Sequence, residues 1–244
     1  MRTLKLIIAY DGTAFAGWQM QASQRTVQGA LEEALQPIEG TRVVVHAAGR
    51  TDAGVHAVGQ VISLSLTSAI TCDALVRALN VRLDEDVRVL SAEEAPADFN
   101  ARFDARQKTY HYAIYNAPVV LPSLRHFVWH VPQPLDVTAM NEAASVLIGE
   151  HDFAAFQAAG SDVITTRREI HASRVVSRDA EVRYEVAGTG FLRHMVRNIV
   201  GTLVEIGRSR RPVEDMARVL QSLDRAHASA TAPPHGLTLA RVDY

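Results

Sequence analysis

One short string of the sequence combines residue types that can do chemistry: Gly49-Arg50-Thr51-Asp52-Ala53-Gly54-Val55-His56. A single carboxylate, Asp52, stands between two glycines, with an arginine before it and a histidine after it. Glycine permits tight turns and the close approach of a ligand, and catalytic groups concentrate on loops that a rigid scaffold positions. An isolated Asp-x-Gly usually caps a turn, but the full string is too particular for that interpretation. Asp52 is therefore the first candidate catalytic group, as nucleophile, base or charge stabiliser.

Length and composition indicate a folded globular protein. The chain has 244 residues, 48% hydrophobic and 21% charged, which is enough for one large domain or two modest ones. No apolar run approaches the length of a membrane span, and the N-terminal pattern is too interrupted for a signal peptide. We therefore expect a cytoplasmic protein with no membrane association. The single cysteine, Cys72, excludes an internal disulfide. His46, Asp52 and His56 could in principle meet around a metal, but nothing else in the sequence supplies a ligand set, so no metal is expected.

The net charge of −2 conceals local groups of basic residues. Ten arginines against six acids fall between residues 160 and 211. Arginine suits bidentate phosphate contacts and stacking on bases, so this pattern favours a polyanion-binding patch. A ratio of 23 arginines to 2 lysines is equally explained by genomic base composition. The candidate phosphate contacts are Arg102, Arg106, Lys108, Arg167, Arg168, Arg208, Arg210 and Arg211.

Hydrophobic periodicity predicts a βαββαβ order in the first half. Residues 3–10 alternate as a strand, and a helix begins near Thr26 and ends near Gly40. Strands at Val43–Val45 and 61–66 flank the Asp52 string. A helix over residues 71–80 and a strand over 87–90 follow. This order is the ferredoxin-like split βαβ pattern.

The second half repeats that order without a visible sequence repeat. Strands are predicted at residues 108–116, 169–177, 181–187 and 237–242, and helices after Asp136 and over 191–206 and 212–223. We therefore expect an α+β protein with two ferredoxin-like halves, residues 1–105 and 106–244. Together they are expected to form a mixed, mainly antiparallel sheet with helices packed on it and a central catalytic cleft.

Several blocks along the chain resemble those of one family. They are Tyr10-Asp11-Gly12, Gly17-Trp18-Gln19, the Asp52 string, Phe99-Asn100-Ala101-Arg102-Phe103, Lys108-Thr109-Tyr110-His111-Tyr112, His151-Asp152-Phe153 and Phe191-Leu192-Arg193-His194-Met195-Val196-Arg197-Asn198. Through them the chain resembles the tRNA pseudouridine synthase A family, from near residue 10 to its last residue. The resemblance implies the pseudouridine synthase fold and isomerisation of uridine to pseudouridine at positions 38, 39 and 40 of the tRNA anticodon stem-loop. It also implies a homodimer that needs no cofactor.

The resemblance also assigns roles to individual residues. It makes Asp52 the catalytic carboxylate, Tyr110 the ring that stacks on the target uracil, and Arg197 the partner of the aspartate. Arg197 is an unusual charge in an otherwise apolar helix pattern. Burial alone raises the pKa of a carboxyl group, whereas a nearby guanidinium lowers it by roughly 1–3 units. Arg50 is the other candidate for this pairing, although we expect it to contact RNA. Tyr112, Tyr115, Trp18, Phe99 and Phe191 are expected mainly to pack in the core or in loops.

Alternatives remain open for both the mechanism and the class of function. Asp52 could attack C1′ of the ribose, attack C6 of the uracil or remove the C2′ proton. A hydrolase with an aspartate nucleophile would instead release free uracil. Glycoside cleavage usually needs two carboxylates, and no second acid stands beside Asp52. A non-catalytic RNA-binding module is the third class, and the joint presence of Asp52, Tyr110 and Arg197 speaks against it.

Overall fold

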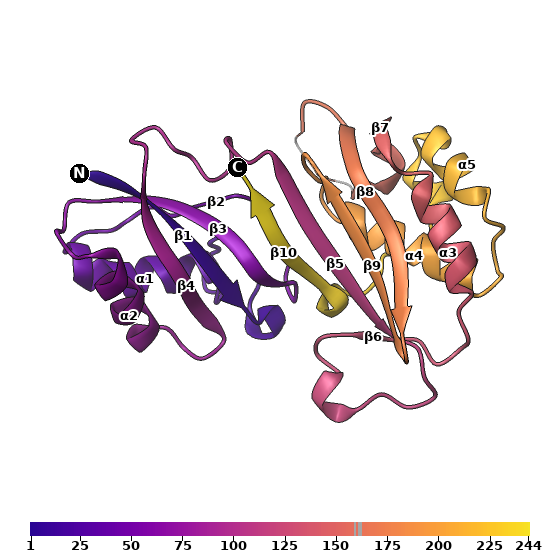
Figure 1. Ribbon diagram of the computed structural model, residues 1–244, viewed down its shortest axis with the longest axis horizontal. Helices are drawn as coiled ribbons and strands as arrows, with labels where there is room; N and C mark the ends of the chain where they lie inside the picture. Colours follow the sequence, from indigo (N-terminus) through magenta and orange to yellow (C-terminus); the bar gives the residue numbers. More distant parts are fainter. Residues whose placement is uncertain (159, 161–162) are drawn as a thin grey trace. The chain divides into compact units, whose positions relative to one another are not determined.

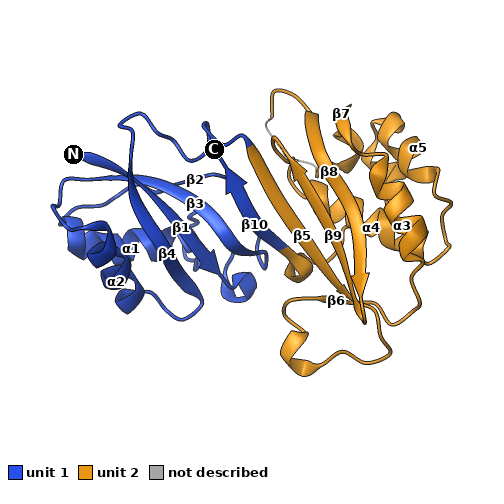
Figure 2. Ribbon diagram, viewed as in Figure 1, with its two compact units in different colours: residues 1–106, 238–244 blue, residues 107–237 orange. Residues whose placement is uncertain are grey.

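The chain forms two compact units in the computed structural model, which describes residues 1–158, 160 and 163–244. Residues 1–106 and 238–244 make the first unit, and residues 107–237 make the second (Figure 2). The closing strand of the chain therefore belongs with the N-terminal residues. Both units combine helices with a mainly antiparallel sheet, which confirms the predicted α+β class.

The first unit is a sheet with two helices (Figure 1). Its elements are β1 (Arg2–Tyr10), α1 (Val27–Glu39), β2 (His46–Ala47), β3 (His56–Leu66), α2 (Cys72–Arg82), β4 (Val87–Ala95) and β10 (Leu237–Asp243). Strand β1 lies antiparallel between β3 and β4, and β2 pairs antiparallel with β3. The order β4-β1-β3-β2 is the ferredoxin-like arrangement that the sequence predicts. Strand β10 pairs in parallel with the start of β3, where Leu239 stands opposite Ala57.

Local signals explain why α1 begins and ends where it does. The Thr26 side chain accepts a hydrogen bond from the Gly29 N–H, which satisfies a free donor of the first turn. Gly40 ends the helix in the left-handed region at φ 81°. Leu31 and Leu35 are fully buried, and burying each such side chain contributes about 1.5–3 kcal/mol. The predicted helix is therefore confirmed.

The predicted strand at Val43–Val45 is wrong, because the strand before the Asp52 string is the two-residue β2. Val43 and Val45 are buried and Val44 is exposed, so the segment has the alternation of a strand. The Val45 N–H, however, donates to the Glu32 carboxylate of α1 at 3.4 Å. A helix side chain has therefore taken the place of a partner strand.

The second unit contributes five strands to the sheet and has three helices in the part that the structure describes (Figure 1). Its elements are β5 (Gln107–Tyr115), β6 (Trp129–His130), α3 (Val137–Ser145), β7 (Gly149–Asp152), β8 (Arg167–Arg178), β9 (Glu181–Gly188), α4 (Met195–Gly207) and α5 (Asp215–Ser222). The strand order is β5-β9-β8-β7 with antiparallel neighbours, and β6 pairs in parallel with β5. The short strands β6 and β7 were not predicted, because two to four residues carry too little periodicity.

Helix α4 begins four residues later than the predicted start at Phe191. His194 adopts a left-handed conformation at φ 59°, which interrupts the helix before Met195. The helix that follows is almost wholly buried, from Met195 to Gly207. Across the described residues, every helix is too short or too polar to cross a bilayer.

Candidate active site

Asp52 opens a tight turn between β2 and β3. The Val55 N–H donates to the Asp52 carbonyl oxygen at 3.1 Å, which closes a four-residue turn. Gly54 is its third residue and has φ +75°, a conformation that favours glycine at this position. Asp52 itself is half-buried, whereas Thr51 and Val55 on either side are buried. The turn thus has a fixed backbone and a carboxylate that is partly open to solvent.

Two glycines from the loop after β1 pack against the backbone of this turn. A Cβ on Gly12 would lie 2.0 Å from the Val55 carbonyl oxygen. A Cβ on Gly17 would lie 2.9 Å from the Thr51 oxygen, and Gly17 also has φ +101°. The Trp18 N–H donates to the same Thr51 oxygen at 3.0 Å. The two loops can approach this closely only because both positions lack a side chain.

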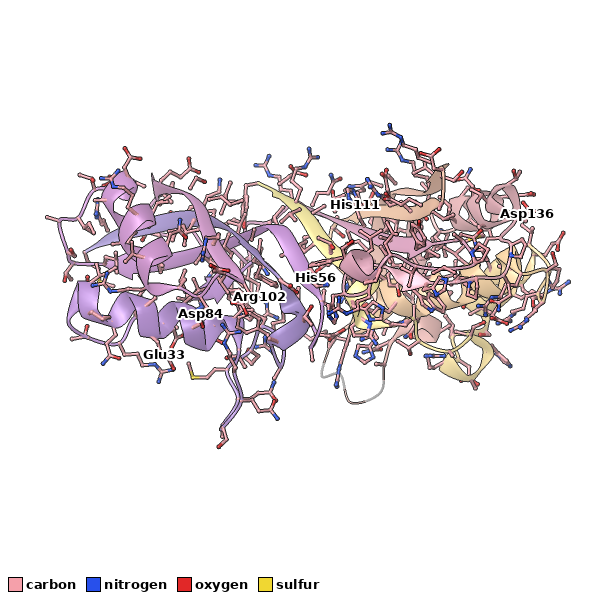
Figure 3. The ribbon with its side chains drawn as sticks, turned by 90° about the horizontal axis from the view of Figure 1, so that it is seen from below. Glu33, His56, Asp84, Arg102, His111 and Asp136 are labelled. Carbon is pink, nitrogen blue, oxygen red and sulfur yellow. The ribbon has the colours of Figure 1, made fainter. Side chains whose placement is uncertain are left out.

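His56 joins the same two loops at the start of β3, where Figure 3 labels it. Its ring is 3% exposed, and Nδ1 accepts a hydrogen bond from the Gly12 N–H at 3.0 Å. Nδ1 also lies 3.2 Å from the Asp11 carboxylate. His56 therefore fixes the loop after β1, a structural role. No three His, Cys, Asp or Glu side chains of the described residues gather as a metal site requires.

Buried hydrogen bonds hold the residues just before Asp52. The Tyr10 hydroxyl lies 2.8 Å from the Thr51 hydroxyl, and Gln60 Nε2 donates to the Gly49 carbonyl oxygen at 2.7 Å. Burial raises the pKa of Tyr10 to about 12, so its hydroxyl keeps its proton at neutral pH. We did not predict these roles from the sequence, although Tyr10 stands in a block that carries the resemblance. Arg50, in contrast, is exposed and forms no ion pair with a described residue.

Tyr110 lies in the second unit, on β5. Its side chain is 7% exposed, and the Phe191 ring meets it edge to face with centroids 5.0 Å apart. Tyr112, two residues further on, is fully buried and donates its hydroxyl proton to the Pro233 carbonyl oxygen at 2.8 Å. Tyr112 is thus a core residue, as expected from the sequence.

Arg197 lies on α4 and is oriented by the chain that follows α5. Its Nε donates to the Ala232 carbonyl oxygen at 2.8 Å, and the Ala232 N–H donates back to the Arg197 carbonyl oxygen at 3.1 Å. The neighbouring Asn198 is fully buried and accepts from Thr231 at 2.7 Å and from Arg225 at 3.2 Å. The bond from Nε to Ala232 fixes one edge of the Arg197 guanidinium.

The structure thus divides the predicted site residues between the units: Asp52 and Arg50 in the first, Tyr110 and Arg197 in the second. Within the first unit, Asp52 and Arg50 lie on one loop. Within the second unit, Tyr110 lies on a strand and Arg197 on a helix. The joint role of the four residues stays a prediction.

Comparison with known proteins assigns the chain to a family. The model of a family described as tRNA pseudouridine synthase matches residues 6–104 and 143–244, which is most of the chain. The chain is 47% identical over its full length to a tRNA pseudouridine synthase A of Pelobacter propionicus, and it covers 100% of that protein. It is 45% identical over its full length to the protein of that name from Maridesulfovibrio salexigens, of which it covers 91%. The chain therefore belongs to the tRNA pseudouridine synthase family.

Family membership confirms the resemblance that the sequence blocks indicate. The chain is accordingly an enzyme of the isomerase class. Asp52, Arg50 and Arg197 lie inside the stretches that the family model matches, whereas Tyr110 lies between them. A tRNA pseudouridine synthase A of Anoxybacillus flavithermus is 46% identical to the whole chain, which covers 99% of that relative, so this similarity spans Tyr110 as well.

Proposed function

We propose that this enzyme converts uridine to pseudouridine at positions 38, 39 and 40 of the tRNA anticodon stem-loop, with Asp52 as its catalytic carboxylate. One observation carries the assignment of Asp52. The backbone of its turn is fixed by close contact with Gly12 and Gly17, whereas its side chain stays partly exposed. A rigid backbone with an accessible carboxylate suits a group that must meet a substrate in one geometry.

The reaction is an isomerisation, so its atoms balance without a co-reactant. The N1–C1′ bond breaks, the uracil rotates and C5 bonds to C1′, while C5 loses a proton and N1 takes one up. Nothing is oxidised and no water is consumed. One ionised carboxylate suffices, whether it attacks C1′, attacks C6 or removes the C2′ proton. These three routes remain alternatives for Asp52.

Tyr110 is our candidate for the residue that receives the target base. A uridine in a stem-loop must leave its stack to reach a catalytic group, and an aromatic face compensates for the lost stacking. The Tyr110 ring is held in place by the edge of Phe191. A ring that is already immobile loses little conformational entropy when a base stacks on it.

Arg197 and Arg50 complete the proposed site. The bond from Arg197 Nε to Ala232 orients the guanidinium before substrate arrives. We assign to it the role that the family resemblance implies, which is to keep the catalytic carboxylate ionised. Arg50 is exposed on the same loop as Asp52, and we assign it to contact with RNA.

Ion pairing sorts the arginines that we consider for the RNA backbone. Arg208 and Arg210 pair with Glu205, and Arg211 pairs with Asp215, so carboxylates already neutralise these three. Arg102, Arg106 and Arg168 form no ion pair with a described residue. Arg102 lies over the Phe103 ring at 5.4 Å, and Arg168 donates to the backbone carbonyls of Thr165 and Arg167. We therefore propose that Arg102, Arg106 and Arg168 contact phosphates.

Arg168 is also half-buried, with no ion-pair partner among the residues that the structure describes. Desolvation lowers the pKa of its guanidinium from the usual value, which means that the surroundings do not compensate its charge. A phosphate would supply that compensation.

We also propose the homodimer that the resemblance implies, which analytical ultracentrifugation would detect as twice the chain mass.

The experiment uses full-length tRNA transcripts that carry one uridine, at position 38, 39 or 40 of the anticodon stem-loop. A control transcript carries its uridine in another arm of the same tRNA. After incubation with the enzyme and digestion to nucleosides, we expect pseudouridine from the three test transcripts and none from the control. Free uracil would identify a hydrolase. Binding without any product would identify a non-catalytic RNA-binding protein.

A further inference from the structure

A chain of buried hydrogen bonds runs from the sheet of the first unit to the residues before Asp52. Ile8 of β1 stands opposite Gln60 of β3, so the two share a face of the sheet. Tyr10, two residues after Ile8, lies on that same face. A bulge between Ile8 and Tyr10 shifts the register, so that Tyr10 stands opposite Ala57. Tyr10 and Gln60 therefore both project from adjacent strands towards Gly49 and Thr51.

The orientation of the Gln60 amide follows from the donors and acceptors available to it. Gln60 Nε2 donates to the Gly49 carbonyl oxygen at 2.7 Å and to the Tyr10 hydroxyl at 3.5 Å. The reversed amide would set two oxygens against each other at Gly49, so the orientation of the amide is determined. Tyr10 accepts from Gln60, and its hydroxyl shares a hydrogen bond with the Thr51 hydroxyl, 2.8 Å away, in which either oxygen can donate. The chain runs from Gln60 through Tyr10 to Thr51.

The other end of the Gln60 amide shows that stability alone does not explain this arrangement. Gln60 is fully buried, and its Oε1 has no hydrogen-bond partner among the described residues. A buried acceptor without a partner is uncommon in native proteins and costs free energy. An apolar residue would avoid this cost but would lose the bond to Gly49. Gln60 instead keeps the hydrogen bond that holds the loop before Asp52.

These bonds act on a stretch that has few other restraints. The Ala48 N–H is bonded to Val61, and the Thr51 carbonyl oxygen accepts from Trp18. Between them, Gly49 lacks a side chain and Arg50 is exposed. The bonds from Gln60 and Tyr10 restrain the two ends of that interval. Its backbone angles set the direction in which the Asp52 side chain leaves the loop.

We propose that Tyr10, Thr51 and Gln60 are positioning residues of the reaction. Their hydrogen-bonded chain fixes the backbone before Asp52 and thereby sets the place of its carboxylate. The inference rests on the proposed catalytic role of Asp52. Because a displacement near 1 Å can lower a rate by about 10²-fold, loss of the chain lowers kcat and leaves the binding of tRNA almost unchanged.

The test compares Tyr10→Phe and Thr51→Val, alone and together, with the wild-type enzyme. Each single variant removes one hydroxyl from the same bond. We expect kcat for pseudouridine formation to fall about 10- to 100-fold in each, with KM for tRNA changed less than threefold. The double variant should be no slower than the slower single variant, because both changes break one bond. Thr51→Ser, which keeps the hydroxyl, should restore most of kcat.

Tyr184→Phe is the matched control. Tyr184 is also fully buried, and its hydroxyl lies 3.0 Å from the Ser173 hydroxyl in the second unit. This variant loses a bond of the same kind between two side chains that are not part of the chain of Gln60, Tyr10 and Thr51, so its kcat should equal that of the wild type. If Tyr10→Phe proves too unstable to assay, the comparison of Thr51→Val with Thr51→Ser carries the test.

Two results would overturn the inference while the proposed function stands. One is a wild-type kcat in both Tyr10→Phe and Thr51→Val, with Asp52→Asn inactive. The other is a double variant in which the two losses multiply, since independent effects exclude a single chain. If the wild-type enzyme forms no pseudouridine at all, the proposed function itself fails.

Discussion

Replacing Gly17 with alanine is the sharpest perturbation of the Asp52 turn that leaves its own residues unchanged. Gly17 has φ +101°, and its added Cβ would lie 2.9 Å from the Thr51 oxygen and 3.1 Å from the Ala53 nitrogen. The substitution therefore imposes both backbone strain at Gly17 and a collision with the turn. We expect the variant to be less stable and to have a displaced Asp52 carboxylate.

Two other glycines separate these contributions. Gly40 has φ +81° and open space around its added Cβ, so Gly40→Ala imposes strain alone, about 1–2 kcal/mol. Gly12→Ala imposes a collision without backbone strain, because Gly12 does not have a positive φ and its added Cβ would lie 2.0 Å from the Val55 carbonyl oxygen. Overpacking of this kind costs about 1–3 kcal/mol or more. Gly17→Ala combines both effects, which gives about 2–5 kcal/mol.

The assay is urea unfolding of all three variants, followed by kcat measured on folded enzyme. We expect Gly40→Ala to retain wild-type kcat, because its added Cβ has open space around it and meets no residue of the Asp52 loop. Gly17→Ala and Gly12→Ala should lose at least tenfold in kcat. If Gly17→Ala lost no more stability than Gly40→Ala and kept its kcat, the close packing of the two loops would not be what positions Asp52.

Three further predictions follow from contacts elsewhere. Arg102→Gln and Arg168→Gln should each reduce the slope of log K against log salt concentration for tRNA binding by about 0.7–0.9. Arg210 pairs with Glu205, so an equal reduction in Arg210→Gln would contradict the proposal that arginines without an ion pair contact the phosphates. The pKa of Tyr10 is raised by burial to about 12, so the folded state holds this proton more tightly than the unfolded chain. The contribution of Tyr10 to the free energy of unfolding, roughly 3 kcal/mol, should be fully present below pH 10 and be lost as pH rises towards 12. The loss of stability over this pH range should be smaller in Tyr10→Phe. A pH profile in that variant equal to that of the wild type would count against the assignment. Asn198→Ala should cost about 2–4 kcal/mol in urea unfolding, because this fully buried side chain loses three hydrogen bonds. A cost below about 1 kcal/mol would contradict the role of this side chain in stabilising α4.

Elements that depend on local signals could be predicted from the sequence. Helix α1 is an example, since Thr26 caps its first turn and Gly40 ends it. The alternation at Val43–Val45 misled the prediction because burial alternates there without a partner strand. The start of α4 was misplaced because the left-handed His194 leaves no mark in the hydrophobic pattern.

The candidate site shows the same division between local and non-local information. The Asp52 string is contiguous, so its residue types are visible together in the sequence. The bonds among Tyr10, Thr51 and Gln60 depend on the register of β1 against β3 and on the bulge between Ile8 and Tyr10. The register between two strands cannot be predicted from a local sequence pattern. Gly12 and Gly17 in the loop after β1 were nevertheless a signal that another backbone approaches there.

The most direct test of the account concerns the Asp52 carboxylate itself. Tritium release from tRNA that carries [5-³H]uridine reports loss of the C5 hydrogen, which pseudouridine formation requires and hydrolysis at N1–C1′ does not. Asp98→Asn is the matched control, because Asp98 is an exposed aspartate in another turn of the first unit, closed by the bond from the Phe99 N–H to the Pro96 oxygen. The account predicts release by the wild type and by Asp98→Asn, and none by Asp52→Asn with its affinity for tRNA retained. Release by Asp52→Asn at the wild-type rate would contradict the central claim.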